Sequence, residues 1–62
     1  MKASELEYKG EYLNLADHRK VAFVFQQGKR YWFTNISVKK PKVYYGDFWI
    51  NEKQVENLLE KI

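Results

Sequence analysis

Apolar and polar residues alternate most clearly across residues 20–38, which read KVAFVFQQGKRYWFTNISV. β-Branched and aromatic residues on both sides of Gly28 are typical of two strands joined by a tight turn. Glycine takes the positive φ that a two-residue hairpin turn needs, and this turn is either Gln27-Gly28 or Gly28-Lys29. The pattern predicts a β-hairpin at the centre of a sheet.

Aromatic residues occupy both faces of this hairpin. One face carries Val21, Phe23, Phe25, Trp32, Thr34, Ile36 and Val38; the other carries Ala22, Val24, Gln26, Tyr31, Phe33, Asn35 and Ser37. The first face is the more apolar by count, which favours it as core. One helix and one short hairpin can cover only one face, so the other is expected to stay partly exposed as an interaction site, unless the sheet curls into a closed barrel.

The segments on either side extend the sheet. Residues 4–16 predict a first hairpin around Lys9-Gly10, with an inward face of Leu6, Tyr8, Leu13 and Leu15. Residues 39–42, Lys-Lys-Pro-Lys, predict an exposed basic loop, because proline has no N–H for a ladder. Residues 43–50 predict a further strand, in which Gly46-Asp47 is a bulge or, alternatively, a turn between two short strands.

The apolar period changes to that of a helix at residues 51–62. Asn51 is a favourable N-cap, and Gln54 stands three residues later as in a capping box. The apolar stripe that would pack on the sheet consists of Val55, Leu58, Leu59 and Ile62. The whole pattern predicts one α+β domain over residues 1–62: a small antiparallel sheet with a C-terminal helix, which fits an SH3-like or chromo-like, partly open barrel.

Positive charge is concentrated in the predicted sheet. The chain has 62 residues and a formal net charge of +3, but residues 19–45 contain no acid and seven basic side chains. These are Arg19, Lys20, Lys29, Arg30, Lys39, Lys40 and Lys42. All the acids precede or follow this segment, so we expect a positive sheet region with negative flanks.

Several classes of function have no support in the sequence. The chain has no cysteine, which excludes disulfides and cysteine-ligated zinc. His18 is its only histidine and lies beside Asp17 in an expected surface turn. With no metal-ligand cluster and no glycine-rich phosphate loop, we expect neither an enzyme nor a cofactor or metal. No apolar run is long enough for a membrane span or a signal peptide, so a cytoplasmic protein without membrane partners is expected.

Three short motifs carry a resemblance. The chain has Tyr8-Lys9-Gly10-Glu11 at the first expected turn, Gly28-Lys29 and Phe33-Thr34 in the central hairpin, and Leu58-Leu59-Glu60-Lys61 near its end. In these it resembles the small basic chromatin proteins of archaea, the Sulfolobus type of about seven kilodaltons. The resemblance implies an SH3-like barrel that binds duplex DNA without sequence preference and wedges apolar side chains into the minor groove.

The same resemblance assigns the two faces of the central hairpin. It places Val24, Tyr31 and Phe33 inward and turns toward DNA the side chains of Phe25, Gln27, Arg30, Trp32 and Thr34. The chain also departs from the family. The basic loop at residues 39–42 replaces a glycine-rich loop, and Gln27 and Arg30 stand where apolar wedges are expected.

Charge and aromatic content together favour a non-enzymatic nucleic-acid-binding domain of low sequence specificity, with DNA or RNA as partner. The candidate binding residues are Phe25, Gln27, Lys29, Arg30, Trp32, Thr34, Lys39, Lys40 and Lys42. The alternative is a small protein-interaction module, such as a phage- or plasmid-encoded inhibitor or an assembly factor, which acts as a monomer or a homodimer. An acidic ridge of Glu52, Glu56 and Glu60 favours this alternative if it borders the aromatic face.

Overall fold

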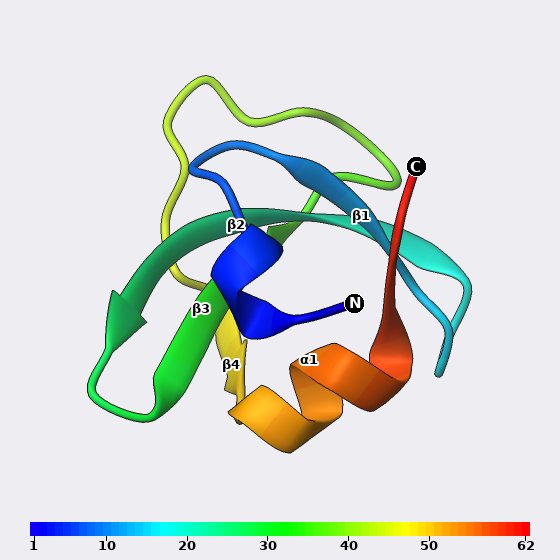
Figure 1. Ribbon diagram of the computed structural model, residues 1–62. Helices are drawn as coiled ribbons and strands as arrows, with labels where there is room; N and C mark the ends of the chain where they lie inside the picture. The colour runs from blue at the N-terminus through cyan, green and yellow to red at the C-terminus, as the bar shows by residue number, and fades with distance from the viewer.

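A computed structural model describes residues 1–62 and contains an antiparallel five-stranded sheet with one short α-helix (Figure 1). In chain order the elements are η1 (Ala3–Glu5), β1 (Glu11–Asn14), β2 (Arg19–Gln27), β3 (Arg30–Asn35), β4 (Phe48–Ile50), α1 (Glu52–Leu58) and β5 (Leu59–Lys61). The strand order in the sheet is β4-β3-β2-β1-β5. The predicted α+β class and antiparallel sheet are confirmed. Neither α1 nor η1 has the length and apolar character that a membrane-spanning helix needs.

The central hairpin is formed by β2 and β3. Gln27 pairs with Arg30, so Gly28-Lys29 is the two-residue turn. Gly28 has a φ of 58° while the φ of Lys29 is not positive, which is the pattern of a type II′ turn. The predicted hairpin is confirmed, although β3 ends at Asn35. The Asn35 side chain accepts hydrogen bonds from the amide and the hydroxyl of Ser37 and turns the chain there.

A β-bulge in β2 decides which face of the hairpin is buried. Phe23 pairs with Phe33 and Phe25 pairs with Trp32, so Val24 is an extra residue on β2. Phe25 shares a face with Trp32, as predicted, but the prediction that Phe23 lies on the same face is wrong. An extra residue reverses the alternation beyond it, which places Phe23 and Phe25 on opposite faces.

One face of the sheet, called the inner face below, holds the hydrophobic core. Its buried side chains are Tyr12, Val21, Tyr31, Phe33, Val55 and Leu59. Both α1 and η1 lie across this face (Figure 1), and Met1, Ala3 and Leu6 of the N-terminal segment pack against the core. Phe33 and Val55 have no exposed surface. Strand β3 and helix α1 thus supply the centre of the core.

The predicted first hairpin over residues 4–16 is wrong. Residues 3–5 form η1, and β1 pairs with β2 and β5 instead of with the segment before it. Tyr12, which the predicted hairpin places on the outward face, is buried. Its burial is tolerated because its hydroxyl oxygen accepts a hydrogen bond from the Glu7 amide at 2.8 Å. A tyrosine whose polar end has a partner can bury more apolar surface than a leucine.

The C-terminal helix is shorter than predicted. The N-cap of α1 is confirmed: the Asn51 side chain accepts from the Gln54 amide, and the Gln54 side chain accepts from the Asn51 amide. The helix ends at Leu58, however, and Leu59–Lys61 form β5 against β1. Pairing the end of the chain with the open edge of β1 satisfies backbone groups of both strands and buries Leu59, so the predicted helix to residue 62 is wrong.

The strand predicted at residues 43–50 is wrong in its first half. Only Phe48–Ile50 pair with β3, and residues 36–47 form a long connection without regular structure, called the 36–47 loop below. Neither the bulge nor the turn predicted at Gly46-Asp47 is present, because residues 43–45 are not a strand. The Asp47 amide donates to the Phe33 carbonyl and leads the chain into β4.

Candidate nucleic-acid interface

The other face of the sheet, called the outer face, carries a row of aromatic side chains. Phe25, Trp32 and Trp49 are direct neighbours across β2, β3 and β4. The rings of Phe25 and Trp32 are stacked, with centroids 5.8 Å apart and an interplanar angle of 13°. Directly opposed side chains on one face of a sheet lie in contact range. Three strands therefore hold three large rings side by side.

The 36–47 loop covers the half of the outer face beyond this row. Thr34 is 3% exposed, and its hydroxyl donates to the Asp47 carboxylate at 2.6 Å. Gly46 lies so close to the rings that a Cβ there would be 2.9 Å from atoms of both Phe25 and Trp32. Trp32 is half-buried, and its indole Nε1 is buried without a hydrogen-bond partner. The loop covers Thr34 and reaches the aromatic row, where Gly46 lies against Phe25 and Trp32.

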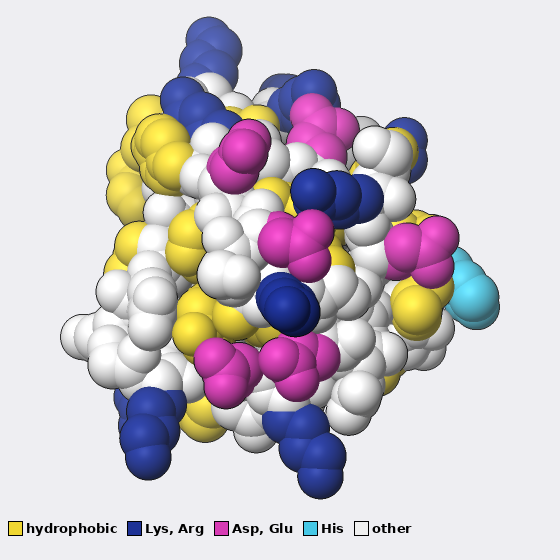
Figure 2. All heavy atoms as spheres, viewed as in Figure 1, with side chains coloured by type: hydrophobic (Ala, Val, Ile, Leu, Met, Phe, Trp, Pro, Cys, Tyr) yellow, Lys and Arg dark blue, Asp and Glu magenta, His cyan; other side chains and the backbone are white.

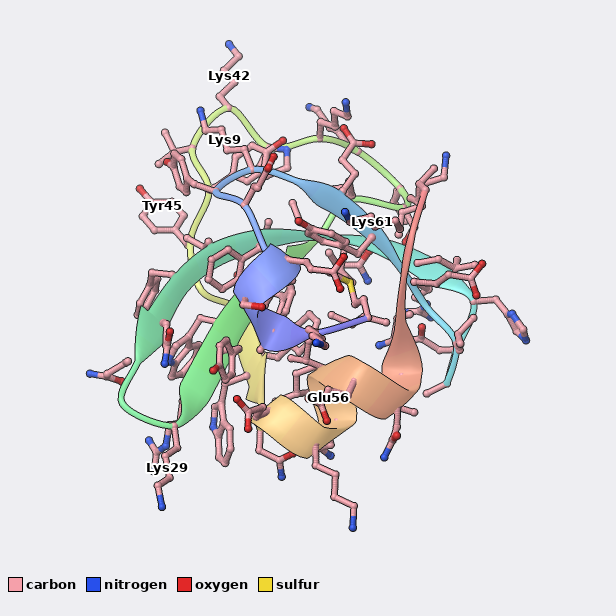
Figure 3. All side chains as sticks on the ribbon, in the orientation of Figure 1. Lys9, Lys29, Lys42, Tyr45, Glu56 and Lys61 are labelled. Atoms are coloured by element: carbon pink, nitrogen blue, oxygen red, sulfur yellow. The ribbon has the colours of Figure 1, made fainter.

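Three aromatic side chains remain accessible around the row. The exposed fractions are 43% for Phe25, 44% for Trp49 and 70% for Tyr45, and we call these three residues the aromatic patch. Hydrophobic side chains gather at the left edge of Figure 2, on the side where Figure 3 places Tyr45. A contiguous exposed apolar patch marks an interaction site more often than scattered single residues do.

Basic side chains lie at both ends of the aromatic patch. The Arg30 guanidinium lies over the Trp49 ring, 4.7 Å from its centroid. In Figure 3, Lys29 and Lys42 lie at opposite ends of the molecule, and Tyr45 is between them on the same side. Lys29, Lys42 and Arg30 are all exposed. We call the side of the molecule that carries Lys42, Tyr45 and Lys29 in Figure 3, together with the Arg30–Trp49 pair, the strip.

Other lysines of the chain have different roles. Lys40 pairs with Glu11, and the hydrogen bond that its ammonium donates to this carboxylate raises the pKa of Lys40. Lys40 thus fastens the 36–47 loop to β1. Lys9 lies 5.1 Å from the centroid of the Tyr44 ring and, in Figure 3, at the same end of the molecule as Lys42. Lys9 adds positive charge to that end.

The acidic side chains gather on the other side of the molecule. Figure 2, which views the side covered by η1 and α1, shows several Asp and Glu side chains there, and Figure 3 places Glu56 on α1. Glu5 of η1 pairs with Lys61 of β5 at 3.3 Å. Glu56 therefore belongs to the inner-face cover, whereas Glu52 lines a groove beside the β2–β3 turn together with Lys29.

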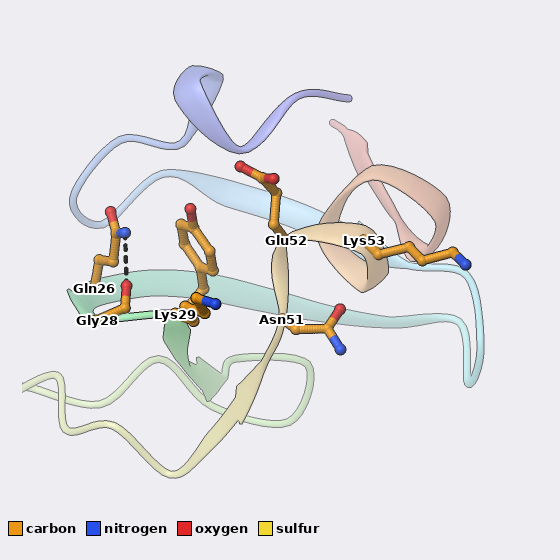
Figure 4. A pocket seen from close by; sticks show the side chains of 7 residues that line it. Gln26, Gly28, Lys29, Asn51, Glu52 and Lys53 are labelled. Atoms are coloured by element: carbon orange, nitrogen blue, oxygen red, sulfur yellow. Dashed lines mark hydrogen bonds between the residues drawn. The ribbon is translucent and has the colours of Figure 1, made fainter.

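A groove with a cavity volume of about 490 Å³ separates the β2–β3 turn from the start of α1. Its lining is polar apart from Tyr31. In Figure 4 the Gln26 side chain donates to the Gly28 carbonyl at 2.9 Å, and the Lys53 side chain extends away from the turn. The structure has no group of three or more His, Cys, Asp or Glu side chains that could hold a metal ion. His18 is an exposed turn residue with a φ of 59°.

The structure brings together only part of the predicted candidate set. Phe25, Gln27, Arg30 and Trp32 share the outer face, with Lys29 at the adjacent turn and Lys39 and Lys42 exposed on the 36–47 loop. Thr34, predicted to face a ligand, is buried beneath the loop, and Lys40 is engaged by Glu11. Tyr31 and Phe33 point into the core, as the resemblance to the chromatin proteins implied.

Three residues outside the predicted set belong to this surface. They are Tyr45, Trp49 and Lys9. Tyr45 and Trp49 were assigned to a strand without a defined face, and Lys9 to a hairpin turn. The position of Trp49 could have been predicted from one feature of the sequence. A strand that follows the loop and pairs with β3 places this tryptophan beside Trp32.

Comparison of the chain with models of known protein families, with curated proteins and with solved structures found no match.

Proposed function

We propose that this domain binds nucleic acid with little sequence preference, through the aromatic patch and the basic side chains around it. The observation that carries the proposal is the position of the charges. Arg30 lies directly on Trp49, and Lys29 and Lys42 lie at the two ends of the strip that contains Tyr45. Cations supply salt-dependent affinity for phosphates, while aromatic rings contact bases.

The distribution of acids supports the same partner. A polyanion is attracted to a surface from which negative charge is absent and is repelled elsewhere. Glu56 lies on α1, which covers the inner face (Figure 3), Glu52 lines the groove that also contains Lys29, and the Asp47 carboxylate accepts a hydrogen bond from the Thr34 hydroxyl. A protein partner that bound at Glu56 would not contact the aromatic patch at the same time. The alternative of a protein-interaction module therefore has less support.

Low sequence preference follows from the chemistry of the patch. Every base has an aromatic face, so stacking on Tyr45, Phe25 or Trp49 accepts any of them. Sequence-specific contacts require hydrogen-bonding groups aimed at base edges. Near the row only Gln27 and Arg30 offer such groups, and Arg30 already lies on the Trp49 ring.

We also propose that the sheet is an SH3-like, partly open barrel. The support is its connectivity. Strand β2 is nine residues long, pairs with β1 from Arg19 to Ala22 and with β3 from Val21 to Gln27, and contains the bulge at Val24 that lets a strand bend. The last strand, β5, returns to pair with the first. Strands β4 and β5 remain as the two edges.

Fluorescence anisotropy tests the proposed function. The titrations use labelled 20-mer DNA, single-stranded and duplex, at 50 and 150 mM NaCl. The reporter variant is Lys29→Gln/Lys42→Gln, and the matched control is Lys2→Gln/Lys53→Gln, which removes the same charge from the acid-bearing side. The wild type is expected to bind in the micromolar range at low salt. The reporter variant should bind more weakly, with a salt slope shallower by about 0.7 to 0.9 for each phosphate that it no longer neutralises.

Comparison of the two double variants shows whether binding depends on the proposed surface or only on net charge. If both double variants weaken binding equally, the interaction is a general response to net charge and the proposed surface is wrong. If the folded wild type binds neither DNA nor a single-stranded RNA at 50 mM NaCl, the proposed function itself is wrong, and the aromatic patch becomes a candidate for protein contact.

A further inference from the structure

We infer that the nucleic acid that fits this surface is a single strand rather than a duplex. The inference rests on the proposed function and adds the class of ligand. A single strand presents unstacked base faces, whereas a duplex presents phosphates and groove edges. The exposed rings of the aromatic patch and the positions of the cations determine whether the surface can contact base faces or only the phosphates and groove edges of a duplex.

The 36–47 loop removes the broad, flat sheet surface that a duplex would need. It covers Thr34, which is 3% exposed, and its Gly46 lies against the rings of Phe25 and Trp32. The part of the outer face left open is the half that contains the aromatic row. Neighbouring strands lie about 4.8 Å apart, so a row across three strands spans about 10 Å. This width suits one chain of nucleotides better than two.

The rings are held as stacking surfaces and not as wedges. Minor-groove wedges are apolar side chains that project and insert between base steps. The Phe25 ring instead lies nearly parallel to Trp32, at 13°, and is held there by Gly46. The Arg30 guanidinium covers one face of the Trp49 ring, 4.7 Å from its centroid, and leaves the other face for a base. Tyr45 is the most exposed ring of the patch, at 70%. Partly exposed rings that are fixed in this way by their neighbours favour stacking on bases that are already unpaired.

The cations follow one line. Lys42 and Lys29 lie at opposite ends of the molecule with Tyr45 between them on one side (Figure 3). A single phosphodiester backbone that runs along this strip would pass Lys42, then the rings, then Arg30 and Lys29. A duplex would place its second row of phosphates beyond these cations.

Competition between strands tests the inference. The probes are (dT)12, (rU)12 and a 12-base-pair DNA duplex, titrated at the same NaCl concentration, with intrinsic tryptophan fluorescence as a second readout. We expect at least tenfold tighter binding of a single strand than of the duplex, with quenching of Trp49 on binding. Tighter binding of either single strand supports the inference, and the ratio between them identifies the preferred sugar.

A ring-specific variant separates stacking from charge. Tyr45→Leu should weaken (dT)12 binding about tenfold with an unchanged salt slope, whereas Tyr45→Phe, which keeps the ring, should bind like the wild type. Heparin, a polyanion without bases, should bind both variants equally. Duplex binding as tight as that of (dT)12 would overturn the inference and, if Lys29→Gln/Lys42→Gln weakened it, leave the proposed function standing. Absence of binding to all three probes would overturn both.

Discussion

The inner and outer faces of the sheet are covered by different elements, which are held by different kinds of interaction. The inner face is covered by α1 and η1, and its central residues Phe33 and Val55 are fully buried. The outer face is covered by the 36–47 loop over half its area, and the loop is held by three polar or aromatic contacts: the Thr34–Asp47 hydrogen bond, the Lys40–Glu11 ion pair and the cation–π contact of Lys9 with Tyr44.

This difference separates stability from binding. Burial of apolar area is the dominant favourable contribution to folding, and the inner face supplies most of it. The outer face leaves Phe25, Tyr45 and Trp49 partly exposed in a chain of only 62 residues, where buried area is scarce. Substitutions in the two faces should therefore produce different effects: loss of the fold on the inner side, and local opening or loss of affinity on the outer side.

The largest effect is expected from the inner face. Phe33→Ala removes a fully buried ring that packs against Phe23 and Phe48, and should destabilise the domain by roughly 3 to 5 kcal/mol. A domain of this size has little more stability than that, so the variant should be largely unfolded by circular dichroism. Val55→Ala removes two buried carbons and should cost about 2 kcal/mol, measurable by urea denaturation. A loss below about 1 kcal/mol for Phe33→Ala would show that the inner face is not the core.

An intermediate effect is expected where the loop meets the rings. Gly46→Ala places a Cβ 2.9 Å from both Phe25 and Trp32, so the loop must shift, at a cost of about 1 to 3 kcal/mol. Because the shift uncovers Trp32, tryptophan emission should move to longer wavelength. Gly28→Ala is the matched control: its φ of 58° makes alanine strained by about 1 kcal/mol, but nothing lies within 4 Å of the new Cβ. Emission that shifts equally in both variants would contradict the close contact at Gly46.

A smaller effect is expected from the hydrogen bond that holds the end of the loop. Thr34→Val keeps the shape of the buried side chain and removes the 2.6 Å bond to Asp47, which should cost about 1 kcal/mol. The Asp47 residue is exposed, so its carboxylate can be hydrated after the change. A double-mutant cycle with Asp47→Ala in urea denaturation should show coupling of about 1 kcal/mol. Strictly additive losses would mean that the bond does not hold the loop.

Local signals in the sequence were enough for two elements. Gly28 between two β-rich runs predicts the hairpin, and Asn51 with Gln54 predicts the helix start, because each depends on residues that are neighbours in the chain. The elements that could not be predicted depend on distant partners. Residues 59–61 have a helical pattern but pair with β1, and Val24 is an ordinary strand residue that becomes a bulge. A single inserted residue reverses every later side chain of its strand, so the face favoured by the apolar count is divided: Val21 and Phe23 face the core, whereas Phe25 and Trp32 lie on the outer face.

The basic residues of the site could be predicted from the sequence, but the residues that the 36–47 loop covers could not. Lys29 and Arg30 follow directly from the hairpin turn, and Phe25 and Trp32 from the family resemblance. Burial of Thr34 and the ion pair of Lys40 both depend on where the 36–47 loop folds. That loop has no periodic pattern, and its position is set by the contact of Gly46 with two rings. Sequence periodicity carries no information about such a contact.

The smallest effects are expected from the two ion pairs, one on each cover, and they should appear at opposite ends of the pH range. A hydrogen bond from the Lys2 amide and then contact with Lys61 hold the pKa of Glu5 below its ordinary value of 4.5. The stabilisation from Glu5 is therefore complete above pH 4.5 and is lost as the pH falls through the lowered pKa. Glu11 raises the pKa of Lys40 above 10.5, so that contribution is complete below pH 10.5 and is lost as the pH rises through the raised pKa.

Urea midpoints measured across pH should separate the two pairs. Glu5→Gln should flatten the acid limb relative to the wild type and leave the alkaline limb unchanged, and Glu11→Gln should do the reverse, so each variant is the control for the other. Glu5 joins η1 to β5 on the inner side, whereas Lys40 joins the 36–47 loop to β1 on the outer side. Because the loop lies against Trp32, loss of the Lys40 pair should also shift tryptophan emission, while loss of the Glu5 pair should not. An emission change on the acid limb that Glu5→Gln abolishes would mean that the two covers are coupled, and the separation of inner stability from outer binding would fail.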